Sequence, residues 1–138
     1  MKINSYLTFD GNCEEAFNFY AQCLGGKIEG LMRFADIPCE DAQIPPGSEE
    51  RIMHMRLLVG DQVLMGSDSC PMQPYEGIKG NSVALNLDCT DEGERIFNAL
   101  AKGGTIEMPF EKTFWATRFG SVKDRFGVPW LINCEVTE

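Results

Sequence analysis

The stretch Gly25-Gly26-Lys27-Ile28-Glu29 returns as Gly103-Gly104-Thr105-Ile106-Glu107, at an offset of 78 residues. Glycine pairs of this kind end helices, because glycine accepts the left-handed conformation that follows a last helical turn. Each copy therefore marks the end of a helix and the start of the next strand. The repeated junction indicates an internal duplication, since an array of repeats needs three or more copies.

The residues before each junction form an apolar stripe with helical spacing. The stripe is Ala16, Phe19, Tyr20, Cys23 and Leu24 in the first copy, and Gly93, Ile96, Phe97, Leu100 and Ala101 in the second. Spacing of this type predicts an amphipathic helix with one buried face. Asn12 with Glu15, and Asp91 with Glu94, have the spacing of a capping box, so we expect the helices to begin there.

Short segments typical of strands surround the two helices. They are residues 3–9, 28–34, 51–59, 62–65 and 82–87, and a last strand around Trp130 to Asn133. This order predicts an α+β fold made of two βαβββ modules. We expect one domain, residues 1–138, with module one at about 1–68, a linker at about 69–80 and module two at about 81–138. The acidic, proline-rich residues 35–50 are expected to form a loop.

The composition excludes several classes of protein. The net charge of −9 would repel a polyanion, so nucleic acid is not an expected partner. The N-terminal residues are not followed by a long apolar stretch, so we expect no signal peptide. No run approaches the ~18 apolar residues that a membrane helix needs. The six cysteines lack the paired short spacings of zinc sites. We therefore expect a cytoplasmic protein with reduced thiols and no membrane partner.

Strand alternation assigns side chains to the two faces of each sheet. Met53, Met55 and Leu57 alternate with His54 and Arg56, so we expect the apolar set to face a helix. The same reasoning places a mixed polar set on the opposite face: Ser5, His54, Arg56, Ser82, Asn86 and Asn133. A concave sheet face with a few polar groups has the form of a ligand pocket. A merely exposed sheet face, or a dimer surface, stays an alternative.

Two segments resemble a known family. Residues Phe9 to Tyr20, ending in Leu24-Gly25-Gly26, resemble the first strand and helix of the PhnB-like proteins, and Thr113-Phe114-Trp115 with Asp124 to Asn133 resembles their C-terminal signature. That family also carries the label 3-demethylubiquinone 3-methyltransferase. It belongs to the vicinal-oxygen-chelate superfamily, with the glyoxalases, bleomycin-resistance proteins and extradiol dioxygenases. The resemblance implies a glyoxalase-like cupped mixed sheet with helices on its outer face, and a homodimer.

The resemblance also implies where a divalent metal would be held. The corresponding positions are Ser5, His54, Ser82 and Leu131. Only His54 is a good ligand, whereas a divalent site needs about three protein ligands. We therefore expect no metal and no cofactor. A methyltransferase loop is not expected either, because the chain contains no G-x-G-x-x-G.

Three classes of function remain after these exclusions. The favoured one is a small-molecule-binding protein, whose ligand would contact Ser5, His54, Arg56, Ser82, Asn86, Trp115 and Asn133. Trp115 would stack on the ligand, with packing at the core or rim as its alternative. The second class is an enzyme of lyase, isomerase or transferase type acting on a small carbonyl or anionic substrate. It would use His54 as candidate base and Arg56, with an externally bound divalent metal. The third is a dimeric scaffold.

Overall fold

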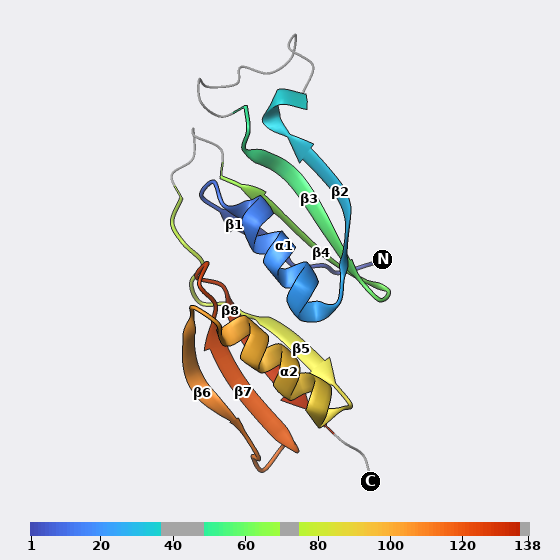
Figure 1. Ribbon diagram of the computed structural model, residues 1–138, viewed down its shortest axis with the longest axis vertical. Helices are drawn as coiled ribbons and strands as arrows, with labels where there is room; N and C mark the ends of the chain where they lie inside the picture. Colours follow the sequence, from blue (N-terminus) through green and yellow to red (C-terminus); the bar gives the residue numbers. More distant parts are fainter. Residues whose placement is uncertain (37–48, 70–74, 136–138) are drawn as a thin grey trace. The chain divides into compact units, whose positions relative to one another are not determined.

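The computed structural model describes residues 1–36, 49–69 and 75–135. The chain divides into two compact units, Met1–Gly77 and Ile78–Glu138. Each unit has one helix packed on one face of a four-stranded sheet (Figure 1). The predicted α+β fold of two βαβββ modules is therefore confirmed. The expected loop at 35–50 and the middle of the expected linker lie largely outside the described residues.

Unit 1 contains one sheet with the strand order β1-β4-β3-β2. Its elements are β1 (Tyr6–Phe9), α1 (Cys13–Leu24), β2 (Lys27–Arg33), the short 3₁₀ helix η1 (Phe34–Asp36), β3 (Ile52–Val59) and β4 (Gln62–Asp68). Strands β1 and β4 are parallel, and the other neighbours are antiparallel. A hairpin turn at Gly60-Asp61 joins β3 to β4, with Gly60 at a φ of 59°.

Unit 2 repeats this topology with the strand order β5-β8-β7-β6. Its elements are β5 (Val83–Leu87), α2 (Thr90–Ala101), β6 (Thr105–Glu111), β7 (Arg118–Lys123) and β8 (Pro129–Cys134). Strands β5 and β8 are parallel, as β1 and β4 are in unit 1. No helix in the described part of the chain is long and apolar enough to cross a membrane.

The core of each unit lies between its helix and its sheet. The largest fully buried side chains include Phe9, Phe17, Tyr20, Met55 and Leu57 in unit 1, and Leu100, Val122, Trp130 and Ile132 in unit 2. Each such side chain contributes about 1.5–3 kcal/mol through burial. The expected core positions Met55 and Leu57 are thus confirmed. We call the sheet face opposite each helix the open face.

The strand β3 departs from simple alternation at its start. Met32 pairs with His54 while Arg33 pairs with Ile52, so Met53 is an extra residue in the ladder. An extra residue of this kind shifts the alternation by one position. Ile52 is therefore buried with Met55, and the expectation that Met53 faces the core is wrong.

The buried face of α1 is rotated from the predicted stripe. Phe17 is fully buried, whereas Phe19 and Leu24 are only half-buried. Cys13, Ala16, Phe17, Tyr20 and Cys23 form the actual contact face. In α2 the predicted residues Gly93, Ile96, Phe97 and Leu100 are buried as expected.

The predicted helix starts, at Asn12 and at Thr90 or Asp91, agree with the structure, but neither predicted capping box forms. Asn12 precedes α1 but makes no capping hydrogen bond with its side chain, and α2 begins at Thr90, after Cys89. The first backbone N–H of α1, on Cys13, instead donates to the Asp68 carboxylate at 3.0 Å. A negatively charged carboxylate at this position also interacts favourably with the positive end of the helix dipole. A residue at the end of β4 therefore replaces the expected local cap.

The predicted helix ends are confirmed. Gly25 follows α1 at a φ of 67° and Gly103 follows α2 at a φ of 75°, both in the left-handed region. One further residue, Lys102, separates α2 from its glycine. That residue explains why the helices repeat at an offset of 77 and the glycine pairs at 78.

Candidate functional site

His54 and Tyr6 meet on the open face of unit 1. The Tyr6 hydroxyl lies 3.5 Å from Nδ1 of His54, and the two rings stack with centroids 5.9 Å apart. Tyr6 comes from β1 and His54 from β3, on either side of β4. The pair can exchange donor and acceptor roles, because an imidazole nitrogen and a phenol can each do both.

Arg56 lies two residues from His54 on the same face. Its guanidinium approaches Glu29 at 3.6 Å, and both side chains are 44% exposed. An ion pair of that length and exposure contributes little to stability. The Nε of Arg56 is buried and has no hydrogen-bond partner among the described residues. The donor capacity that the guanidinium can offer to a ligand therefore lies in its exposed terminal nitrogens, which are held only by this long ion pair in the described chain.

Ser5 does not share this face with His54. Leu7 and Phe9 of β1 are buried against α1, and Ser5 continues their alternation. The helix-based offset of 77 made Ser5 the counterpart of Ser82. In the structure the β1–α1 connection is one residue longer than the β5–α2 connection. Corresponding residues of β1 and β5 are therefore 78 positions apart, whereas those of the helices are 77 apart. Tyr6, which the sequence reasoning missed, is the residue of this strand beside His54.

Ser82 borders a hollow of about 370 Å³ on unit 2. Ser121 and Leu131, which are paired across β7 and β8, line it together with Lys79 and Lys123. Neither lysine forms an ion pair with another described residue. Two hydroxyls, two ammonium groups and the carboxylate of Glu107 give this hollow a polar rim of mixed charge.

Asn86 and Asn133 lie side by side further along the same open face. They are register partners in β5 and β8, and Nδ2 of Asn133 donates to Oδ1 of Asn86 at 3.3 Å. Oδ1 of Asn133 is buried and has no hydrogen-bond partner in the described chain. An unpaired buried acceptor costs about 1–3 kcal/mol, which a ligand donor would relieve.

Trp115 belongs to an aromatic cluster between β6 and β7. Its ring contacts Phe114 at a centroid distance of 4.7 Å and Phe119 at 5.3 Å, both edge to face. Trp115 is 46% exposed and Phe114 is 96% exposed. Phe119 pairs with Asn133 across β7 and β8. The cluster is therefore continuous with the two asparagines.

The signature segment that begins at Asp124 has a structural role. Oδ1 of Asp124 accepts hydrogen bonds from the N–H groups of Phe126 (2.8 Å) and Val128 (3.0 Å). Its Oδ2 accepts one from the indole of Trp130 at 2.8 Å. Asp124 is 3% exposed. The carboxylate closes the β7–β8 hairpin and is not available to a ligand.

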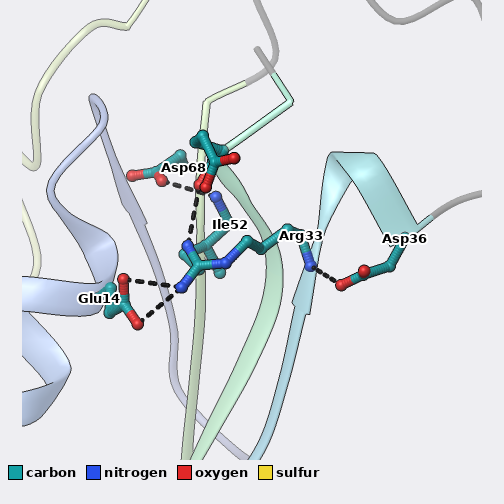
Figure 2. Close-up of polar contacts among 6 residues, drawn as sticks. Glu14, Arg33, Asp36, Ile52 and Asp68 are labelled. Atoms are coloured by element: carbon teal, nitrogen blue, oxygen red, sulfur yellow. Dashed lines mark hydrogen bonds and ion pairs between the residues drawn. The ribbon is translucent and has the colours of Figure 1, made fainter.

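Asp68 ties several segments of unit 1 together in a similar way. Its carboxylate accepts from the N–H groups of Gly11 (2.9 Å) and Cys13 (3.0 Å) on one oxygen, and from Ile52 (2.8 Å) on the other. Close to Asp68, the Arg33 guanidinium donates hydrogen bonds to both carboxylate oxygens of Glu14 on α1, at 3.0 and 2.9 Å (Figure 2). These charged groups hold the start of α1 to the sheet rather than form a site.

The Cys13 thiol is not an activated nucleophile. The residue is fully buried. Burial, and then the neighbouring carboxylates of Asp68 and Glu14, raise the pKa of the thiol far above its ordinary value. A thiol in this state stays protonated and inert near neutral pH.

The residues at the implied metal positions do not fit a divalent metal. Serine hydroxyls and a leucine offer no donor set for a transition metal beside His54. Within the described ranges, no group of three His, Cys, Asp or Glu side chains is arranged to hold an ion. We therefore route no chemistry through a metal at these positions.

Comparison with known proteins places the chain in a family. A family model described as 3-demethylubiquinone-9 3-methyltransferase matches residues 1–133. The chain belongs to this family, whose members include PhnB-like proteins. The glycine pairs of this member nevertheless end helices at positive φ and do not form a nucleotide-binding loop.

Several known proteins match the chain along almost all of its length. Protein YjdN of Escherichia coli (strain K12) is 35% identical, over 96% of this chain and 95% of that protein. The crystal structure of protein PA1353 from Pseudomonas aeruginosa is 50% identical and superposes with a TM-score of 0.89, covering 99% of each chain. A PhnB protein from Bacillus cereus, described as a putative 3-demethylubiquinone-9 3-methyltransferase, is 27% identical with a TM-score of 0.78, covering 97% of this chain and 99% of that one.

A more distant likeness concerns the fold alone. The fosfomycin resistance protein FosX from Listeria monocytogenes has a TM-score of 0.67 at 7% identity, over 99% of this chain and 94% of that chain. The chain thus has the α+β glyoxalase-like fold that FosX also has.

Proposed function

We propose that this chain is a cytoplasmic small-molecule-binding protein, and that the open face of unit 1 takes an anionic or carbonyl-bearing ligand at Arg56. The observation that carries the proposal is the state of that guanidinium. It is half-exposed, its only ion pair in the described chain is long at 3.6 Å, and its Nε is buried without a partner. Guanidinium groups recognise carboxylates through two parallel hydrogen bonds.

The neighbours of Arg56 support a ligand of mixed character. Tyr6 and His54 present a stacked aromatic surface with polar edges, and Met32 is register partner to His54 and 44% exposed. An apolar patch with a few convergent polar groups is typical of ligand sites. Asp68 and Asp124 are buried and engaged in structural hydrogen bonds, so neither carboxylate is offered for catalysis. Binding needs fewer reactive groups than catalysis, which favours a binding function.

Binding can be tested with a library of small carboxylates and keto acids in a thermal-shift screen, followed by calorimetry on any hit. Replacing Arg56 by Ala should weaken an anionic hit by about 1.5–3 kcal/mol, the scale of a charged hydrogen bond. The matched control is Arg95→Ala, which removes a similarly exposed guanidinium paired with Glu92 on α2. Equal losses in both variants, or no loss in Arg56→Ala, would reject the assignment.

The Tyr6–His54 contact favours a second candidate, an enzyme that moves a proton at this face. A phenol next to an imidazole nitrogen can act as a proton relay when a substrate carbonyl is bound by Arg56. His54→Gln should then abolish turnover of a bound compound while leaving its affinity within about threefold. Unchanged turnover in that variant removes the candidate.

We also propose that the protein is a homodimer. The edge strands β2 and β6 carry exposed apolar side chains, with Leu31, Met32, Ile106 and Met108 between 39% and 51% exposed. Exposed sheet edges and apolar patches are commonly covered by a second copy. Sedimentation at micromolar concentration should give a dimer, and Met108→Lys should shift it toward monomer. A monomer alone in the wild type contradicts the proposal.

A further inference from the structure

Four side chains form a continuous row across the open face of unit 2. Asn86, Asn133 and Phe119 are consecutive register partners on β5, β8 and β7, and Trp115, in the loop that precedes β7, contacts Phe119 at 5.3 Å. Directly paired residues on neighbouring strands place their side chains on the same face. Because strands lie about 4.8 Å apart, the three strand residues span about 10 Å. The row thus passes from amide groups to aromatic rings.

The amide end of the row has an unused hydrogen-bond acceptor. Asn133 gives its Nδ2 hydrogen bond to Asn86, whereas its Oδ1 is buried and lacks a partner within the described residues. Buried amide oxygens are nearly always paired in folded proteins. Because this oxygen has almost no exposed surface, a ligand N–H reaches it only when the half-buried Asn133 side chain turns outward, and the new hydrogen bond then satisfies it.

The aromatic end of the row is held in place before any ligand arrives. Thr113 and Ala116 exchange two hydrogen bonds, through the Thr113 N–H (3.2 Å) and its Oγ1 (3.1 Å). The Thr117 N–H donates to the carbonyl of Cys134 at 3.0 Å, and Ala116 is only 6% exposed. A turn anchored at both ends thus presents Phe114 and Trp115 outward. Rigid aromatic groups bind at a low cost in conformational entropy.

From this juxtaposition we propose that the row Asn86–Asn133–Phe119–Trp115 binds a flat, fused-ring aromatic molecule that carries a ring N–H. The N–H donates to Oδ1 of Asn133, and the rings lie over Phe119 against the exposed part of Trp115. A span of about 10 Å matches two or three fused rings. This site deepens the proposed small-molecule-binding function, but it is in the other unit from Arg56 and takes a different chemical class.

Acridone and N-methylacridone are suitable probes for this site. Both are flat, uncharged and fluorescent three-ring molecules, and only acridone has the N–H donor. Fluorescence titration of the full chain should show acridone binding about tenfold more tightly than N-methylacridone, since the methyl group leaves a buried acceptor unpaired. In Asn133→Ala the two probes should bind equally. Trp115→Ala should weaken both by about tenfold, the scale of one lost stacking contact, and Trp115→Phe should recover part of that loss.

Matched controls separate this site from general stickiness and from misfolding. Asn98→Ala changes an exposed asparagine on α2, and Tyr75→Ala changes an aromatic residue that is 37% exposed outside the row. Neither should alter either affinity, and all variants should keep the wild-type melting temperature within a few degrees. Equal binding of the two probes to the wild type, or no acridone binding, overturns the proposal. Arg56→Ala should leave acridone binding unchanged, so failure here is distinct from failure of the anion site.

Discussion

The buried carboxylate of Asp124 gives the sharpest test of what the C-terminal signature does. Replacing Asp124 by Asn keeps the size and shape of the side chain but turns one acceptor oxygen into an NH₂ group. In the native structure the donors to this carboxylate include two backbone N–H groups on Oδ1 and the Trp130 indole on Oδ2. The amide can keep the backbone pair only by pointing its NH₂ at the indole N–H, so two donors would then face each other.

The expected cost follows from the bonds lost. One charge-assisted hydrogen bond to the indole disappears, at about 1.5–3 kcal/mol. The two remaining bonds weaken from charged to neutral, which adds about 1 kcal/mol. Asp124→Asn should therefore lower the free energy of unfolding by about 2.5–4 kcal/mol. Asp88→Asn, at an exposed position after β5, should stay within about 0.5 kcal/mol of wild type.

Urea unfolding followed by circular dichroism measures both variants. A double-mutant cycle with Trp130→Phe isolates the indole contact, because Asn in that background no longer opposes an N–H group. The cost of Asp124→Asn should then fall by at least 1 kcal/mol. If Asp124→Asn unfolds like wild type but loses ligand binding, the signature segment acts in function and the structural interpretation is wrong.

Three further outcomes are expected. Burial raises the pKa of the Cys13 thiol above its ordinary value of 9.0, so the free energy of unfolding should keep its full value below pH 9 and fall by about 1.4 kcal/mol per pH unit above it. Thermal melts of Cys13→Ala should show a shallower alkaline decline than the wild type, and an unchanged slope contradicts this. Gly66→Ala should destabilise by about 1–3 kcal/mol, since its Cβ would lie 2.8 Å from the Leu7 carbonyl, whereas Gly30→Ala, with nothing within 4 Å, should be tolerated in the same melts. Elemental analysis should find no stoichiometric zinc, nickel or iron, and about one metal per chain lost on His54→Ala would refute it.

The sequence was sufficient to predict the duplication and most of the faces, because both depend on local spacing. The glycine pairs at Gly25 and Gly103 end helices through their own conformation, without help from distant residues. The alternation around Leu85 and Ile132 likewise follows from the pleat of a strand. These features are set by residues close together in the chain.

Features that depend on long-range contacts escaped prediction. The bulge at Met53 is defined by its pairing with β2, so alternation within β3 alone gave the wrong face for that residue. Tyr6 was missed because a longer β1–α1 connection moves the strand by one position relative to its helix. Asp68 caps α1 by accepting a hydrogen bond from the N–H group of Cys13, which lies 55 residues away in the sequence. A motif of neighbouring residues cannot predict a contact over that separation. The unpaired oxygen of Asn133 depends equally on its neighbour across the sheet.

The two halves close the same strand-to-helix turn with different chemistry. Asp68 is the last residue of β4 paired with β1, and Cys134 holds the same place in β8 beside β5. In unit 2 the Cys134 thiol lies 3.7 Å from the carbonyl of Cys89, at the start of α2. In each half, the donors and acceptors of the strand-to-helix turn thus fit the residue that ends the fourth strand of the same half. A chimera that exchanges only the turns would leave donors without acceptors, so an exchange between the halves should succeed only when both pieces are transferred together.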